Sequence, residues 1–465
     1  MSGEVVVLLA ALALLLLIAI EVPVALALAL AGALGLALLG QGHNLLSILG
    51  STPYSATAKY ALVVICMYIL LGALITHAGI GMAIYRAVNR VIGRFAGGLA
   101  ATAVSATALF SGISGSSAAD VAAFGRVSVQ EMTRHGYRRE YAAAVVAAAG
   151  AFAALIPPSV GFVLYGIIAE ESISALIFAG IVPGVISCLA LTVFVIVRAR
   201  FSWDTHGTAL GGRPPSQVAS GTPLGTATLD PEAPARRGGL ARLLGSDAWG
   251  IVYAVVIFLI VVGGLYSGQF TATEAGAVGA LVAALITVIE VKKQRRSLRT
   301  VFAAAFRESV ATSSMIFLLL VGGAIFGYMI TVSGLPQSLT QGIAATGMPP
   351  MAVAGLILLA LIPLGMAIDG LTLMLITVPL IAPVIASLGL DGIWYGVLVL
   401  KAVEIGLITP PVGLNVFIVS AATGAKVERV FGFLVPFVVL DLVLTGVYFA
   451  FPDLVLWLPR VAGLH

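Results

Sequence analysis

The chain has 465 residues, of which 60% are hydrophobic and only 9% are charged, and its mean hydropathy is +1.12. Soluble globular domains carry roughly a quarter charged residues, so this composition excludes a soluble domain and indicates several membrane-spanning segments. The formal net charge of +4 does not point to nucleic acid, because the Lys and Arg residues cluster at the ends of apolar segments and not on one face.

Long apolar runs follow one another along the whole sequence. In the first half they fall at about 4–20, 23–40, 60–78, 95–131, 140–168 and 174–197, and in the second at about 249–266, 274–291, 311–331, 351–387, 392–421 and 427–450. A helix needs about 20 apolar residues to cross a bilayer. The runs at 95–131 and 351–387 are longer and carry Gly, Ser or Asp in their middles. They predict re-entrant hairpins, each made of two half-length helices joined at a polar tip.

Turn-forming residues in the two halves share a constant spacing of 253 residues. This spacing separates Pro157-Pro158 from Pro410-Pro411, Gly112 from Gly365, Gly136 from Gly389, Pro183 from Pro436 and Glu21 from Glu274. A constant spacing over so many positions indicates an internal sequence repeat of two units. Proline breaks a membrane helix, and matching breaks in two halves are the best sequence pointer to a transporter's binding site.

Basic residues distinguish the flanks of the two hairpins. They cluster on both sides of 95–131, whereas residues 300–399 contain only Arg307. Since basic residues mark cytoplasmic loops, we expect the first hairpin to enter from the cytoplasm and the second from outside. The pattern predicts an all-α polytopic membrane protein of two inverted-topology repeats, with both termini periplasmic. Each repeat would contain about five crossing helices, one re-entrant hairpin and one helix broken at its Pro-Pro pair.

The expected organisation therefore has three parts. Residues 1–200 form the first repeat, with its hairpin at about 95–131 and its broken helix at about 140–168. Residues 248–465 form the second, with its hairpin at about 351–387 and its broken helix at about 392–421. Residues 201–247 are rich in Gly, Pro, Ser and Thr and are predicted to be a flexible cytoplasmic linker. Segments 82–94 and 295–308 mix basic and apolar residues at helical spacing, which predicts interfacial helices.

The two hairpin tips carry the candidate chemistry. Hydroxyl and carbonyl oxygens of the first tip are hard ligands that suit an alkali cation, although close helix packing also enriches Gly and Ser. In the second tip, Asp369 is a candidate ligand of an ion and a candidate cap of the following half-helix, and the two roles are compatible. The residues predicted to bind the alkali cation are Ser114, Gly115, Ser116, Ser117, Pro157, Pro158, Gly365, Asp369, Gly370, Thr409 and Pro410.

The ligand is expected to be a small anion. Four half-helix N-termini would converge on the cavity, and their partial positive charges suit an anion. The predicted substrate contacts are Ser116, Ser159, Gly161, Asp369, Val412, Gly413 and Asn415. Elsewhere, Lys401 and Glu404 stand at the spacing of a helical ion pair, with tuning of the ion path as the alternative role. Glu274 and Glu21 are expected to cap helices.

Enzymatic function is disfavoured. The sequence contains no phosphate-binding loop, HExxH or CxxC, and its five His residues are scattered. The segment Gly112-Ile113-Ser114-Gly115-Ser116 differs from the GxSxG of serine hydrolases, and no His and Asp partners are apparent. No cofactor is expected beyond a coupling ion. Cys66 and Cys188 lie in apolar runs and are interpreted as buried free thiols.

The chain resembles the large membrane subunit (DctM-like) of TRAP (tripartite ATP-independent periplasmic) transporters. The resemblance covers nearly the whole chain except 201–247, and the long linker and Lys401 depart from the family pattern. The motifs that carry it are Phe110-Ser111-Gly112-Ile113-Ser114-Gly115-Ser116, Gly136-Tyr137, Ile156-Pro157-Pro158-Ser159, Thr273-Glu274-Ala275 and Glu404-Ile405-Gly406-Leu407-Ile408-Thr409-Pro410-Pro411-Val412-Gly413-Leu414-Asn415.

The resemblance implies a sodium-coupled, elevator-type permease that imports an organic acid across the bacterial inner membrane. It also implies two protein partners, a small four-helix membrane subunit and a periplasmic substrate-binding protein. Beyond these, membrane lipid and the small anionic substrate are expected to contact the chain, and nucleic acid is not. The alternatives are a self-sufficient cation-coupled carboxylate or anion transporter of the same architecture, a passive channel and a non-transporting scaffold.

Overall fold

The computed structural model describes residues 2–95, 97–153, 155–201 and 248–464. All regular secondary structure within these ranges is helical. The predicted linker at 201–247 lies outside the described residues, except for Phe201 at the end of a helix.

The helices of the first half follow the apolar runs closely. They are α1 (Gly3–Ala19), α2 (Val24–Leu38), α3 (Leu45–Thr57), the short 3₁₀ helix η1 (Tyr60–Leu62), α4 (Val63–His77), α5 (Ile80–Ile92), α6 (Gly98–Ser114), α7 (Ser117–Arg134), α8 (Arg139–Ala153), α9 (Val160–Ala169) and α10 (Ile173–Phe201).

The helices of the second half start at similar relative positions. They are α12 (Ala248–Tyr266), α13 (Ala272–Lys293), α14 (Leu298–Val332), α15 (Leu335–Thr346), α16 (Pro350–Ala367), α17 (Gly370–Ser387), α18 (Gly392–Leu407), α19 (Leu414–Thr423), α20 (Val427–Ala450) and α21 (Pro452–Val461). Helices α7 and α17 have 18 residues each and start 253 residues apart, and α9 and α19 have 10 each and start 254 apart.

The chain is an all-α, multi-pass membrane protein. Within the described ranges, eight helices are long and apolar enough to cross a bilayer. The shorter apolar helices include α6, α9 and α19, which end or begin at the hairpin tip and at the two Pro-Pro breaks. Both Pro-Pro peptide bonds are cis. The two cysteines are free, as expected, but both are half-buried and not fully buried.

The prediction of a separate interfacial helix at 295–308 is wrong. Helix α14 runs without interruption for 35 residues from Leu298, because no proline or glycine occurs before Gly322 to stop it. The corresponding part of the first half is divided into α3, η1 and α4, and α3 contains Pro53. Helices α3, α15 and α21 were not expected from the apolar runs.

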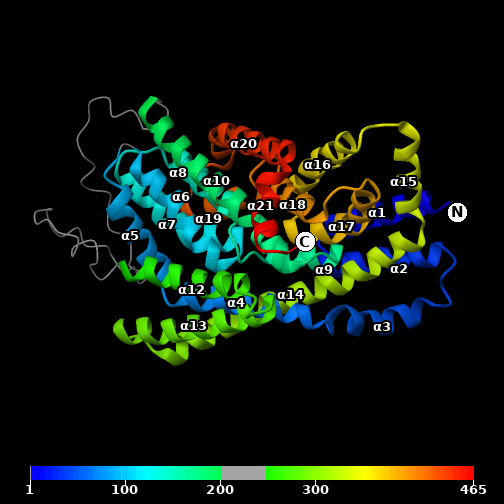
Figure 1. The fold of residues 1–465 in the computed structure, drawn as a ribbon, viewed down its shortest axis with the longest axis horizontal. Helices are drawn as coiled ribbons and strands as arrows, with labels where there is room; N and C mark the ends of the chain where they lie inside the picture. The colour runs from blue at the N-terminus through cyan, green and yellow to red at the C-terminus, as the bar shows by residue number, and fades with distance from the viewer. Residues whose placement is uncertain (1, 96, 154, 202–247, 465) are drawn as a thin grey trace, which may run out of the picture.

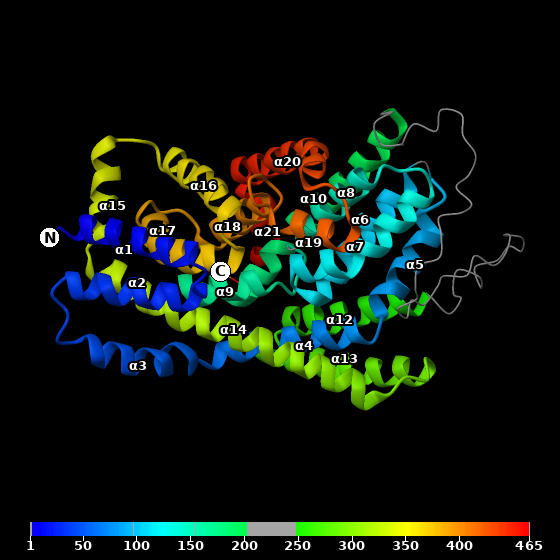
Figure 2. The ribbon, with the colours of Figure 1, turned by 180° about the vertical axis from the view of Figure 1, so that it is seen from behind.

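Helices from both sequence halves lie side by side. In both ribbon views, α2, α3, α4, α12, α13 and α14 occupy one long side, while the hairpins α6–α7 and α16–α17 lie toward opposite ends (Figures 1 and 2). Glycine brings α2 and α14 into close contact, since a Cβ on Gly322 would lie 2.1 Å from the carbonyl oxygen of Ala25. Such small-residue contacts are the usual way in which membrane helices approach one another.

Helix α18 is the most enclosed helix near the centre of the fold. Every residue from Ile393 to Leu407 is buried, including two charged ones. Lys401 does not pair with Glu404 as predicted. Its ammonium donates to Asp441 on α20, both side chains being 0% exposed, and it lies 4.6 Å from the centre of the Phe152 ring. The pairing is between helices because a partner on α20 faces Lys401 directly.

Two predicted helix caps have different outcomes. Thr271 and Glu274 form the predicted capping box at the start of α13, with the Thr271 amide donating to Glu274 Oε2 at 2.8 Å. Glu21 caps no helix, because Pro23 occupies the N-cap position of α2 and Glu21 adopts a left-handed backbone conformation with φ of 66°.

Candidate functional site

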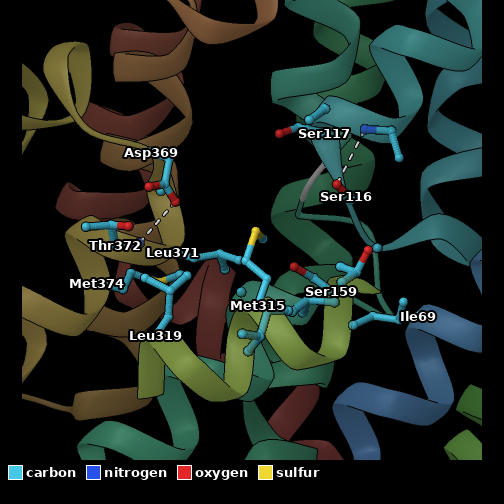
Figure 3. A pocket seen from close by; sticks show the side chains of 18 of the residues that line it. Ile69, Ser116, Ser117, Ser159, Met315, Leu319, Asp369, Leu371, Thr372 and Met374 are labelled. Atoms are coloured by element: carbon cyan, nitrogen blue, oxygen red, sulfur yellow. Dashed lines mark hydrogen bonds between the residues drawn. The ribbon is translucent and has the colours of Figure 1, made fainter. Parts of the chain in front are cut away.

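A cavity of about 580 Å³ lies between the two hairpin tips. The tips contribute Ser114 to Ala119 from one side and Asp369 to Thr372 from the other, while α4, α14 and α18 supply most of the remaining wall. Figure 3 shows Asp369 facing Ser116 and Ser117 across the open space. Segments 253 residues apart in the sequence therefore meet at one site.

The first tip turns between Ser114 and Ser117. Gly115 has φ of +67°, a conformation that glycine adopts without strain. Ser116 then caps α7, its hydroxyl accepting from the Ala119 amide at 3.4 Å. The tip rests on the first Pro-Pro break, since the Val160 amide donates to the Gly115 carbonyl oxygen at 3.4 Å.

The second tip turns at Ile368 and Asp369. Asp369 caps α17, because Oδ1 accepts from the Thr372 amide at 3.1 Å. No hydrogen bond to the other carboxylate oxygen is present within the described part of the chain, and Asp369 lines the cavity at this tip (Figure 3). Capping and ligand binding by Asp369 are thus geometrically compatible. Behind the tip, the backbones of Gly365 and Gly406 touch, which seats this hairpin on α18 just before the second break.

The remaining wall is mostly apolar. Met315 and Leu319 of α14 project into the cavity below the two tips, together with Leu371, Met374 and Ile69 (Figure 3). At one margin, Glu308 Oε2 lies 2.6 Å from Nε2 of His77. The described lining residues include three carboxylates, Asp369, Glu404 and Glu308, and no Lys or Arg.

The described ranges contain no cluster of three or more His, Cys, Asp or Glu side chains that could hold a metal ion. The polar groups of the site are instead hydroxyls, backbone carbonyls and single carboxylates. These hard oxygen donors suit an alkali cation. The arrangement places oxygen donors at each tip and leaves space for a small ligand between them.

The comparisons with known proteins agree on one family. Residues 11–454 match the family described as "Tripartite ATP-independent periplasmic transporter, DctM component". This chain belongs to the DctM family of TRAP transporter membrane subunits. Members of that family are permease subunits and not enzymes.

Several DctM-family relatives cover most of the chain. The C4-dicarboxylate TRAP transporter large permease protein DctM of Pseudomonas aeruginosa is 31% identical over 411 residues, covering 88% of this chain and 89% of its own. The sialic acid TRAP transporter large permease protein SiaM of Vibrio cholerae is 30% identical and covers 87% of each. The ectoine/5-hydroxyectoine permease UehC of Ruegeria pomeroyi is 28% identical and covers 86% of each.

A solved structure shares the fold. The YdaH transporter of Alcanivorax borkumensis aligns with a TM-score of 0.59 at 14% identity, covering 88% of this chain and 89% of its own. At this identity the likeness concerns architecture alone.

Half of the predicted site residues of this DctM-family chain line the cavity. Those that do are Ser114, Gly115, Ser116, Ser117, Ser159, Gly161, Asp369 and Gly370. Those that do not are Pro157, Pro158, Gly365, Thr409, Pro410, Val412, Gly413 and Asn415. Several of the second group support the wall from behind: the Pro158 carbonyl lies 2.8 Å from a Cβ placed on Gly115.

Three acidic side chains belong to the site or its support without having been predicted as ligands. Glu308 and Glu404 line the cavity, and Asp120, which is fully buried, accepts a hydrogen bond from the Ser114 hydroxyl. For Asp120 and Glu404 the available signal was a carboxyl group inside an apolar run, which in a membrane helix marks a polar interior. Glu308 lies just before an apolar run and gave no such signal.

Proposed function

We propose that this chain is the large permease subunit of a sodium-coupled, binding-protein-dependent secondary transporter that imports an organic acid. The observation that carries the proposal is the pair of polar hairpin tips from the two sequence halves, facing each other across one cavity. A carboxylate substrate would bind between them, held by helix N-termini, amides and co-bound cations. The absence of Lys and Arg among the described lining residues makes such cations necessary for charge balance.

One sodium ion is proposed at each tip. At the first, oxygens of Ser114 to Ser117 and the carbonyls of the Pro157-Pro158 break supply ligands, and the Val160–Gly115 hydrogen bond holds the two segments together. At the second, the corresponding groups are Asp369, Gly370 and the carbonyls around Thr409 and Pro410. Each sodium that enters gains about 2.3 kcal/mol per 100 mV of membrane potential. Two ions offset the charge of a dianion, and their concentration gradient then drives accumulation.

We propose that the two halves are inverted-topology repeats that work as an elevator. The matching bounds of α7 and α17 support the repeat. The long side formed by α2, α3, α4, α12, α13 and α14 would be static, and the hairpins with the broken helices would slide against it (Figure 1). After replacement of both native cysteines, Leu319→Cys and Leu371→Cys joined by a reducible cross-linker should arrest uptake until reduction. Full uptake by the cross-linked protein would contradict sliding.

The partners follow from the family. The relatives named above are large permease proteins of TRAP transporters, and the family description calls these transporters tripartite. We propose that this chain acts in the bacterial inner membrane with a small four-helix membrane subunit and a periplasmic binding protein, both of its termini being periplasmic. The relatives carry names with three different substrates, C4-dicarboxylate, sialic acid and ectoine, so substrate choice is assigned mainly to the binding protein.

The deciding experiment is uptake into proteoliposomes with each component added or omitted. Uptake should require an inward sodium gradient, the small subunit and the loaded binding protein together. Strong sodium-driven accumulation by this chain alone would contradict the tripartite proposal and favour a self-sufficient transporter. Downhill flux without saturation would favour a channel.

Substitutions at the tips test the cation sites. Asp369→Ala and the triple change of Ser114, Ser116 and Ser117 to Ala should each raise the sodium concentration for half-maximal uptake. The expected loss of sodium-binding free energy is about 1–3 kcal/mol in each case. Asp369→Asn separates the two roles of this residue, because the amide can still cap α17 but carries no charge. Unchanged sodium dependence in both the Asp369→Ala and the triple variant would remove the tip assignment.

A further inference from the structure

Behind the first hairpin tip, three buried side chains have polar atoms without a hydrogen-bond partner among the described residues. They are Asp120 through Oδ2, Glu404 through Oε2, and Asn415 through both Oδ1 and Nδ2. Asp120 and Asn415 are 0% exposed and Glu404 is 9% exposed. Unpaired buried polar groups are rare in native proteins, and each asks for an explanation such as a water or an ion.

These side chains come from three different helices and meet at the first turn of α7. Asp120 lies in that turn. Glu404 on α18 faces the Ser117 hydroxyl and is close enough to Asp120 for their charges to interact. Asn415 lies in the first turn of α19: a Cβ placed on Gly150 would lie 3.7 Å from its Nδ2 and 3.1 Å from the Ser117 carbonyl oxygen. The Asn415 amide nitrogen and the Ser117 carbonyl oxygen therefore both lie within 4 Å of one point beside Gly150.

The buried charges in this region do not balance, because positive counter-charge is missing. Asp120, Glu404 and Asp441 are three buried acids, and Lys401 is the one base beside them in the described part of the chain. Lys401 already donates to Asp441. The carboxyls of Asp120 and Glu404 are left with the partial positive charge of the α7 N-terminus and no full counter-charge. An uncompensated buried carboxylate is far more costly than a paired one.

We propose that Asp120, Glu404 and Asn415 bind a monovalent metal cation behind Ser117, adjoining but separate from the two hairpin-tip sites. Carboxylate, amide and hydroxyl oxygens form a hard donor set of the kind that alkali cations take. Its identity as sodium rests on the proposed function. The site joins α7 of the first half to α18 and α19 of the second, so an ion there ties the first hairpin to the second broken helix.

Direct binding of ²²Na⁺ to the purified full-length chain tests the site without transport. Glu404→Gln, Asp120→Asn and Asn415→Leu should each remove one bound sodium ion or weaken it about tenfold or more, as expected for loss of a ligand to a buried charge. Asp369→Ala should lose a different ion and keep this one. If all three variants bind as many ions as the parent and equally tightly, the inference is wrong.

Thermal melting distinguishes a cation ligand from a merely structural carboxyl. In sodium-free buffer, Glu404→Gln should melt at a higher temperature than the parent, because it removes an uncompensated buried charge. Added sodium should then raise its melting temperature less than that of the parent. A variant that melts lower in sodium-free buffer and keeps the full sodium-dependent rise would show a structural carboxyl and overturn the site.

The two proposals fail in different ways. Uptake that proceeds without sodium, together with loss of one bound ion in Glu404→Gln, would contradict sodium coupling and support the site. Sodium-dependent uptake, together with unchanged ion binding in all three variants, would support coupling and contradict the site.

Discussion

The contact between Gly365 and Gly406 allows a test in which a methyl group is added to one glycine or to the other, with different expected effects. A Cβ on Gly406 would lie 2.5 Å from the carbonyl carbon of Gly365 and 2.7 Å from its Cα, whereas a Cβ on Gly365 would meet nothing closer than 3.4 Å. The first distance is about 0.9 Å short of an ordinary contact of 3.4 Å. Because the clash is with backbone, α16 must move as a whole, and Asp369 lies four residues further along.

We expect Gly406→Ala to cost about 1–3 kcal/mol of stability, the usual range for overpacking. The displaced tip should also raise the sodium concentration for half-maximal uptake about tenfold, which corresponds to about 1.4 kcal/mol. Gly365→Ala should be neutral or slightly stabilising, since alanine favours a helix over glycine by about 0.5–1 kcal/mol.

Melting temperature and sodium-dependent uptake of the two variants, measured side by side, provide the assay. Equal damage by both substitutions, or wild-type behaviour of Gly406→Ala, would refute the reasoning that this contact positions the second tip.

Three further outcomes follow from the structure. Lys401→Met should destabilise the protein by about 3–5 kcal/mol by leaving the Asp441 carboxyl buried without its partner, and adding Asp441→Leu should restore most of the melting temperature; no recovery would argue against the pair. Gly115→Ala should impair uptake, because φ of Gly115 is +67° and the added Cβ would lie 2.8 Å from a carbonyl oxygen. Gly136→Ala isolates the backbone strain of about 1–2 kcal/mol, because φ of Gly136 is +89° and the space around it is open. Equal effects of the two substitutions would mean that crowding is unimportant. Glu171 lies between α9 and α10, and its pKa is raised first by burial and second by the charge of Asp391. Stability should therefore fall as the pH rises from the ordinary carboxyl range through this raised pKa. Glu171→Gln should lack that fall, and the same pH dependence of the melting temperature in variant and parent would contradict the assignment.

Much of the architecture can be predicted from the sequence, because membrane-spanning helices are recognised by their long apolar runs. The family and the all-α, multi-pass fold are confirmed. Helices α3 and α15 escape a search for apolar runs because Ser, Thr, Gly and Pro interrupt both, and Gln interrupts α15 as well. The uninterrupted course of α14 also escapes it, since basic residues near Arg299 indicate an interface but do not stop a helix.

Side-chain partners are harder to predict than helices. Sequence spacing exposes neighbours on one helix, such as Lys401 and Glu404, but the partner that Lys401 takes is 40 residues away on α20. The same limit applies to the second break. Whether Val412, Gly413 and Asn415 face the cavity depends on how α19 packs against α7 and α8, which no local pattern encodes. The polar tips were easier, because a turn at membrane depth needs Gly, Ser or Asp.

The enclosed position of α18 has a consequence for how the protein is made. Two charges lie within its 16 residues, and it is not among the described helices that are apolar and long enough to span a bilayer. A charge at the centre of a helix opposes insertion by about 2.5–3.5 kcal/mol on the translocon scale. Lys401 gains its partner only after Asp441 has been synthesised. Helix α18 therefore depends on α20, whose Asp441 lies 40 residues after Lys401, and a product truncated before Asp441 would expose an unpaired lysine to the lipid and to membrane proteases.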